Sequence, residues 1–231
     1  MLDFSLSTQV TVDDRILAQW QEIANTMAEL IGVPAGLIMR VRDENIEVLV
    51  SNDSEGNPYE AGAKERLLGS GLYCETVLKT GRKLLVPHAP SDEQWKDNPD
   101  IKLNMVSYLG FPLLFPNGAP FGTICVLDNK ENAYSELYER LITNLRSVVE
   151  GHLELVYANH LLGEECRRLS DYIDEITALR GIIPICMHCK NVRDDEGFWQ
   201  AVETYVSDHT DAEFSHAICP KCAQELYPEL P

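Results

Sequence analysis

The first apolar pattern along the chain is that of an amphipathic helix, because its apolar residues recur at intervals of three and four. Asp13 or Asp14 supplies a side chain that can cap the first turn. Gly32 and Pro34 follow the last apolar position and predict the end of the helix. The apolar positions are Ile16, Leu17, Trp20, Ile23, Ala24, Met27 and Leu30.

Short apolar segments bounded by turn-forming residues then predict a set of strands. These segments are residues 37–41, 46–50, 83–87, 107–114 and 121–127. A short helix is expected over residues 72–79, ended by Gly81. Residues 88–105 form a long connection rich in Asp, Pro and Asn, and structured loops of this length often bind ligands. The pattern predicts an α+β fold with an antiparallel-rich sheet and helices packed on it.

A long helix is predicted from about Ser135 to Arg180, because this stretch lacks proline and contains only two glycines. Two series of residues in it are spaced by seven: Leu145, His152, Asn159, Cys166 and Ile173 in one, and Val148, Leu155, Leu162, Leu169 and Ile176 in the other. They correspond to the a and d positions of a coiled coil, where a buried Asn159 would fix the register of a two-stranded pairing. We expect a homodimer through residues 145–176. The alternative is a single amphipathic helix packed on the chain's own domain.

The C-terminal fragment contains two Cys-x-x-Cys segments, Cys186 with Cys189 and Cys219 with Cys222. Zinc prefers thiolates in a tetrahedral arrangement, and a fragment of this size needs a cross-link because its own core is marginal. We expect the four sulfurs to bind one structural Zn²⁺ ion. A thioredoxin-like redox pair is the rival interpretation. A sensor that releases zinc when its thiolates are oxidised is another.

Composition narrows the function classes. The 231 residues carry 37 acidic and 19 basic side chains, a formal net charge of −18, and such a surface repels nucleic-acid phosphates and anionic lipids. No apolar run is long enough to span a bilayer, and the first residues have neither the basic nor the apolar region of a signal peptide. We therefore expect a cytoplasmic protein without nucleic-acid or membrane partners. Seven cysteines in that setting indicate thiols or metal ligands rather than disulfides.

Four separated segments, in this order, resemble those of bacterial GAF domains. They are Gly71-Leu72-Tyr73-Cys74-Glu75-Thr76-Val77, Trp95-Lys96-Asp97-Asn98-Pro99, Tyr108-Leu109-Gly110-Phe111-Pro112 and Phe121-Gly122-Thr123-Ile124-Cys125-Val126-Leu127-Asp128. The resemblance covers about residues 13–150. It implies a central antiparallel sheet with helices behind it and a small-molecule pocket on the opposite face, walled by the long connection. Of the cyclic-nucleotide signature of such domains only Asn129-Lys130 is present, so the ligand stays unidentified.

The candidate ligand-binding residues are Cys74, Trp95, Tyr108, Phe111 and Phe121, although aromatic residues at such positions more often belong to the core. Cys74 is expected in the first turn of its helix, where the helix dipole can lower the pKa of a thiol and make it reactive. An inert buried thiol explains Cys74 equally well. GAF proteins that reduce free methionine sulfoxide also use cysteines, one of them near a helix start.

The chain is therefore interpreted as a GAF sensor domain (1–134), a dimerising helix (135–180) and a four-cysteine zinc module (181–231). The module resembles one found after sensory or receiver domains in bacterial signalling proteins. We expect a non-enzymatic sensor without catalytic residues, in which a small molecule or redox state at the GAF domain acts through the helix on a protein partner of the module. The alternatives are a free methionine sulfoxide reductase and a sensor based on the zinc thiolates.

Overall fold

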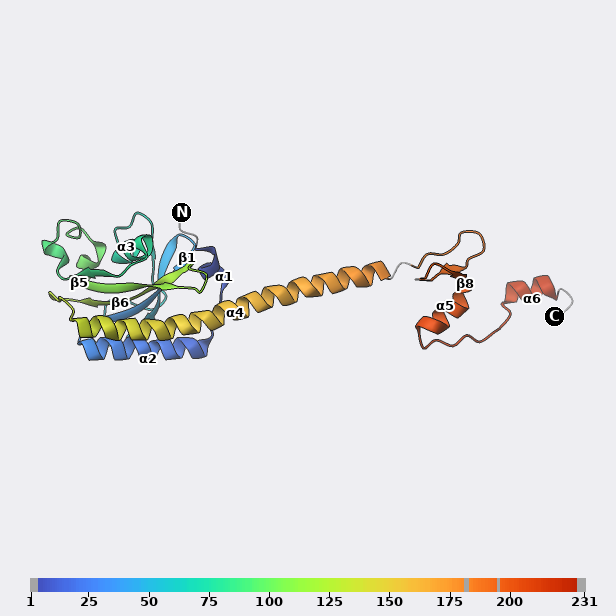
Figure 1. Ribbon diagram of the computed structural model, residues 1–231, viewed down its shortest axis with the longest axis horizontal. Coiled ribbons are helices and arrows are strands. Elements are labelled where there is room, and N and C mark those ends of the chain that lie inside the picture. The colour runs from blue at the N-terminus through green and yellow to red at the C-terminus, as the bar shows by residue number, and fades with distance from the viewer. Residues whose placement is uncertain (1–3, 181–182, 195, 228–231) are drawn as a thin grey trace. The chain divides into compact units, whose positions relative to one another are not determined.

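The computed structural model describes residues 4–180, 183–194 and 196–227, with side chains in the long helix described up to residue 173. The chain divides into two compact units, Met1–Glu165 and Cys166–Pro231. Figure 1 shows the elements of both units. No helix in the described ranges is long and apolar enough to cross a membrane.

The predicted N-terminal helix is confirmed as α2, Asp14–Ile31. Asp13 caps it by accepting a hydrogen bond from the Arg15 N–H at 2.8 Å. Gly32 ends it in the left-handed conformation. A shorter helix that the pattern did not predict, α1 (Ser5–Gln9), precedes it, and the Ser7 hydroxyl of α1 donates to the Val41 carbonyl at 2.7 Å.

A six-stranded, wholly antiparallel sheet forms the centre of the first unit. Its strand order is β3-β2-β1-β6-β5-β4. The strands are β1 (Ala35–Arg42), β2 (Asn45–Ser51), β3 (Lys64–Arg66), β4 (Leu84–Val86), β5 (Ser107–Leu114) and β6 (Pro120–Asp128). The strands expected from the sequence are confirmed, and the short exposed edge strand β3 is an addition to them.

The two faces of the sheet carry two separate cores, because side chains alternate between faces along each strand. On one face, Ile38, Leu109 and Ile124 pack with the buried sides of α2 and of the long helix α4 (Glu136–Arg180). On the other face, Leu37, Met39 and neighbouring side chains pack with α3 (Tyr73–Thr80). Figure 1 shows α2 and α4 together on one side of the sheet and α3 on the other.

The long connection between β4 and β5 contains two short 3₁₀ helices, η1 (Ala89–Ser91) and η2 (Pro99–Leu103). Asn98 caps η2, because its side-chain oxygen accepts from the Asp100 N–H at 2.9 Å. The Asn98 side-chain amide also donates to the Gly71 carbonyl at 2.8 Å, which ties the connection to the loop before α3. The connection is thus held in place on the α3 face of the sheet.

Helix α4 is one continuous helix, as the absence of proline predicted. Ile142, Val149 and Leu153 are fully buried against the rest of the first unit. The indole N–H of Trp20, in α2, donates to the His152 ring at 3.0 Å. His152, which the heptad pattern assigned to a dimer seam, therefore faces the chain's own domain.

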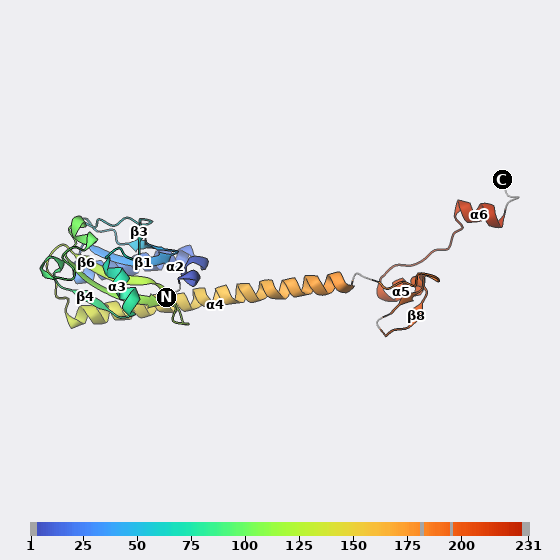
Figure 2. The same ribbon diagram turned by 90° about the horizontal axis from the view of Figure 1, so that it is seen from above.

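The second unit contains the strands β7 (Val192–Arg193) and β8 (Trp199–Gln200) and the helices α5 (Val202–His209) and α6 (Pro220–Leu226). The two strands pair in antiparallel fashion, and β8 and α5 lie side by side in both views (Figures 1 and 2). Within residues 183–194 and 196–227, Val192 is the one buried side chain.

Candidate functional site

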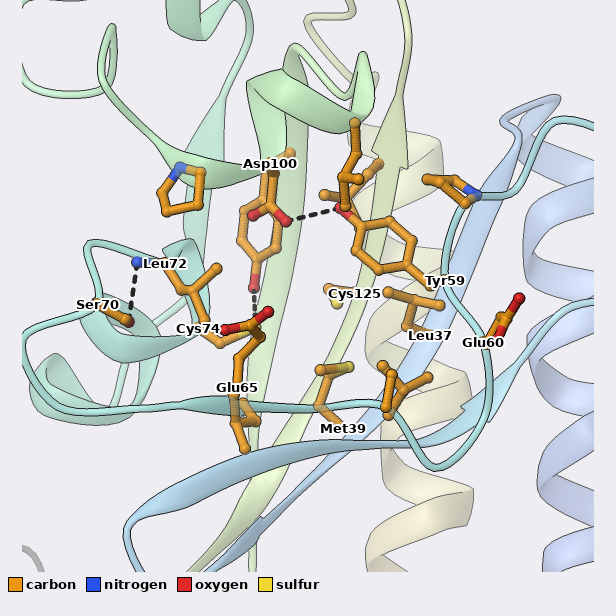
Figure 3. A pocket seen from close by; sticks show the side chains of 18 of the residues that line it. Leu37, Met39, Tyr59, Glu60, Glu65, Ser70, Leu72, Cys74, Asp100 and Cys125 are labelled. Atoms are coloured by element: carbon orange, nitrogen blue, oxygen red, sulfur yellow. Dashed lines mark hydrogen bonds between the residues drawn. The ribbon is translucent and has the colours of Figure 1, made fainter.

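A cavity of about 670 Å³ opens on the α3 face of the sheet. Its base is formed by side chains of β1, β2, β5 and β6, and its walls by residues 58–66, the start of α3 and η2 (Figure 3). Most lining side chains are apolar, among them Leu37, Met39, Ile46, Val48, Leu72 and Leu127. Its size and composition are those of a small-molecule site.

Tyr108 reaches the cavity because Gly110, two residues further along β5, has no side chain. A Cβ atom at residue 110 would lie 2.0 Å from the Tyr108 hydroxyl oxygen, so any other residue would displace the ring. The Tyr108 ring stacks on Tyr73 with 4.6 Å between ring centroids. Its hydroxyl lies 3.7 Å from the Cys74 sulfur. The glycine therefore sets the position of this aromatic wall.

Two thiols lie together in the cavity wall, Cys74 from α3 and Cys125 from β6. The Thr123 hydroxyl donates to the Cys74 sulfur at 3.2 Å. A hydrogen bond shared with Cys125, together with those from Thr123 and Tyr108, lowers the pKa of Cys74. The same Cys74–Cys125 interaction, together with burial, raises the pKa of Cys125. Cys74 is thus the thiol of the pair that ionises more readily.

The one buried carboxylate among the lining residues belongs to Asp100, in η2. It accepts a hydrogen bond from the Tyr59 hydroxyl at 2.8 Å, and Figure 3 shows the two groups facing each other. Burial raises the pKa of Asp100 to about 6, while the Tyr59 hydrogen bond acts in the opposite direction. Neither residue was a sequence-based candidate. Asp100 does lie in the connection expected to bind ligand, directly after the Asn98-Pro99 turn, whereas Tyr59 follows no recognisable pattern.

The sequence-based candidates divide between the two faces of the sheet. Cys74 and Tyr108 line the cavity. Trp95 is buried in the core on the same face, with its ring 5.1 Å from that of Tyr73, but it is not part of the cavity lining. Phe111 and Phe121 lie in the core on the α2 and α4 face, where Phe121 meets Trp20 edge-on at 5.7 Å. The structure therefore brings two of the five together at the cavity and directs Phe111 and Phe121 away from it.

The C-terminal cysteine pairs each form a compact local turn. After the first pair, the Lys190 N–H donates to the Cys186 carbonyl at 3.0 Å, and Lys190 adopts a positive φ of 63°. Cys219 is the N-cap of α6, so Cys222 lies in its first turn. Backbone N–H groups, first those of Cys189 and Cys222, lower the pKa of Cys186 and Cys219 respectively.

The two pairs are not brought together into one cluster. In the part of the chain that the structure describes, no group of three or more His, Cys, Asp or Glu side chains converges closely enough to hold a metal ion. Each pair by itself therefore offers two thiols, fewer than the four ligands of a structural zinc site.

Several solved structures share the fold of the first unit. The blue-light-absorbing form of the PixJ GAF domain from Thermosynechococcus elongatus is 17% identical, with a TM-score of 0.53 over 70% of this chain and 98% of that one. A methyl-accepting chemotaxis protein fragment is 12% identical, with a TM-score of 0.52 over 67% and 96%. Free methionine-R-sulfoxide reductase from Neisseria meningitidis, in complex with its substrate, is 13% identical, with a TM-score of 0.52 over 67% and 86%. At these identities the likeness concerns the fold alone.

The sequence itself matches one family model. No sequence among the curated proteins matches this chain. The model for the GAF domain matches residues 20–150, which include the whole sheet, α3 and the first part of α4. More than half of the chain is thus covered, and the fold agrees with the solved GAF structures. The chain belongs to the GAF domain family.

Proposed function

We propose that this chain is a signal-transduction sensor whose GAF domain binds a small molecule in the cavity on the α3 face. The observation that carries the proposal is the cavity itself, which combines about 670 Å³ of space and an apolar lining with a buried carboxylate and two thiols. Sensory proteins such as PixJ and a methyl-accepting chemotaxis protein share its fold. Of the cyclic-nucleotide signature the sequence carries only Asn129-Lys130, so it does not identify the ligand.

Cavity binding can be tested with the neutral fluorescent probe N-phenyl-1-naphthylamine. Ala63 lines the cavity and is exposed, so a tryptophan at this position can fill the opening without disturbing the core. We expect the probe to bind the wild-type chain and Ala63→Trp to abolish its fluorescence increase. Ala61→Trp is the matched control, because Ala61 is also exposed but does not line the cavity. Equal probe binding by both variants would contradict the proposal.

We further propose that α4 pairs with α4 of a second copy. One heptad series remains exposed after the helix has packed on its own domain: Val148 (48%), Leu155 (59%), Leu162 (63%) and Leu169 (54%). Ile142, Val149 and Leu153 occupy the opposite side and are buried in the domain. An apolar stripe with this spacing favours a two-stranded coiled coil. Asn159 is exposed between these positions and would fix the register.

Adjacent leucines offer a matched test of this pairing. Leu162 belongs to the heptad series, whereas Leu161, which is 45% exposed, does not. We expect sedimentation velocity to show a dimer for the wild type and for Leu161→Glu, and a monomer for Leu162→Glu. Asn159→Leu should alter the oligomeric state, because it removes the polar group that specifies two-stranded pairing. A wild-type monomer would refute the proposal.

The C-terminal module is proposed to fold around one zinc ion bound by Cys186, Cys189, Cys219 and Cys222. Its apolar side chains are largely exposed, including Met187 (89%), Phe198 (68%), Trp199 (52%), Ile218 (55%) and Leu226 (66%). A fragment this small gains little from its own core, and a metal that joins the two pairs would let these side chains pack. Zinc here has a structural role, and redox-dependent zinc release is the alternative role for the same thiolates.

We propose that the zinc module passes the ligand-binding signal of the GAF domain on to a protein partner. The strongly acidic chain disfavours nucleic acid and anionic membranes, so a protein surface fits better. A ligand in the cavity would act through α4, which begins in the GAF domain and continues into the second unit. Coupling of this kind requires that the ligand favour one of two helix arrangements.

A free methionine sulfoxide reductase is the second candidate function. The paired thiols Cys74 and Cys125 in the cavity wall favour it, as does the fold shared with the Neisseria meningitidis enzyme. Such an enzyme would turn over free methionine sulfoxide with a thiol reductant, and Cys74→Ser would abolish the turnover. Absence of turnover by the wild-type chain would exclude this candidate.

A further inference from the structure

Asp100 is held rigidly where it enters the cavity. Its backbone N–H donates to the Asn98 side chain, and its carbonyl accepts from the Met105 N–H at 3.1 Å. The side chain is 8% exposed and lies among the cavity-lining residues. Both backbone groups are thus bonded, which fixes the Asp100 backbone in η2 beside the cavity.

No cation in the described part of the chain forms an ion pair with this carboxylate. Two basic residues, Arg66 and Lys102, also line the cavity. The Arg66 guanidinium pairs with Glu44 at 3.9 Å, and the exposed Lys102 forms no ion pair with Asp100. Burial is the main cause of the raised pKa of Asp100, and the negative charge of Glu65, another lining residue, raises it further. The buried Asp100 carboxylate therefore has no direct counter-charge among the described residues, and most of the other lining residues are apolar.

The Tyr59 hydroxyl donates one hydrogen bond to the Asp100 carboxylate but does not neutralise its negative charge. A carboxylate accepts several hydrogen bonds, and a buried one is costly unless it is paired and fully bonded. A positively charged nitrogen supplies both the charge and the donors, and its hydrogen bond to a carboxylate is among the strong ones in proteins. The apolar lining in turn suits an apolar body attached to that nitrogen.

We propose that the cavity selects small organic cations, meaning amines with an apolar body, and that Asp100 binds the charged nitrogen. The proposal rests on cavity binding as the function of the GAF domain and names the chemical class of its ligand. Anions and neutral molecules of the same shape bind more weakly, because they leave Asp100 without a counter-charge.

The test is displacement of N-phenyl-1-naphthylamine from the 231-residue chain by two matched pairs of competitors. Tryptamine is compared with 3-indolepropionate, and phenethylamine with 3-phenylpropionate, since each pair has one shape and opposite charges. We expect at least one amine to displace the probe at about tenfold lower concentration than its matched acid, a factor expected for a charge-assisted hydrogen bond.

Asp100→Asn should remove this preference, with at least about a tenfold loss for the amine and no loss for the acid. Asparagine retains an oxygen that can accept from Tyr59, so an unchanged melting temperature shows that the loss is not due to misfolding. Asp97→Asn is the matched control, because Asp97 is exposed in the same connection and does not line the cavity.

The outcomes distinguish a wrong ligand class from a failure of cavity binding itself. If the probe binds in an Ala63-dependent way but neither amine outcompetes its acid, or Asp100→Asn behaves like Asp97→Asn, the ligand class is wrong and cavity binding stands. If the probe does not bind at all, both fail.

Discussion

The wild-type chain is expected to hold one zinc ion, and Cys219→Ser to lose it during dialysis against a chelator of moderate affinity. Three thiolates and a serine hydroxyl make a poorer site for zinc than four thiolates. The proposed ion would close the loop between the two cysteine pairs and let the exposed Trp199 side chain pack, so its loss should also remove that packing. Metal analysis and near-ultraviolet circular dichroism measure the two effects.

Cys166→Ser is the control, because Cys166 is an exposed thiol in α4 outside both pairs. It should keep the full zinc content. Cobalt in place of zinc should give the absorption of a tetrahedral thiolate complex in the wild type and a changed spectrum in Cys219→Ser. A wild-type chain without zinc after expression in zinc-supplemented medium, and without cobalt absorption, would refute the site.

Replacing Gly122 with alanine should destabilise the GAF domain by about 3 kcal/mol or more. Gly122 lies in β6 opposite Arg40 of β1, where a Cβ atom would come within 1.8 Å of the Met39 carbonyl oxygen. The clash is with backbone, so two central strands would have to separate. Urea unfolding followed by tryptophan fluorescence measures the change, with Trp199→Phe in every chain so that the signal comes from the GAF domain.

Replacing Gly151 with alanine should instead increase the stability of the protein. Gly151 lies in α4, and a Cβ atom there meets nothing within 4 Å. Alanine should therefore stabilise the helix by about 0.5–1 kcal/mol through its higher helix propensity. Equal changes in the free energy of unfolding for the two substitutions would show that the close contact at Gly122 does not exclude a larger side chain from this position.

The fold could be predicted from the sequence wherever periodicity and end signals agree. Asp13 and Gly32 mark both ends of α2, and the alternation in β5 and β6 matches the two cores. Edge strand β3 was not predicted, because its three residues are all exposed and polar and show no alternation of apolar and polar positions. The domain limits at residues 134 and 180, the dimer and the zinc site remain predictions.

The site was harder to predict than the fold, because alternation shows that two residues lie on opposite faces but not which face is open. Tyr108 and Phe111 are both aromatic and buried in β5, yet one lines the cavity and the other packs beneath α2 and α4. Asp100 and Tyr59 are 41 residues apart in sequence. Their contact depends on the folded path of two loops, which residue spacing does not encode.

Residue 110 determines where the Tyr108 ring lies in the cavity wall. The Tyr108 ring can lie along β5 only while this position has no side chain. Any larger residue would turn the ring outward into the space that a ligand needs. A change of ligand size in relatives of this chain should therefore appear first at residue 110, a position that need not touch the ligand.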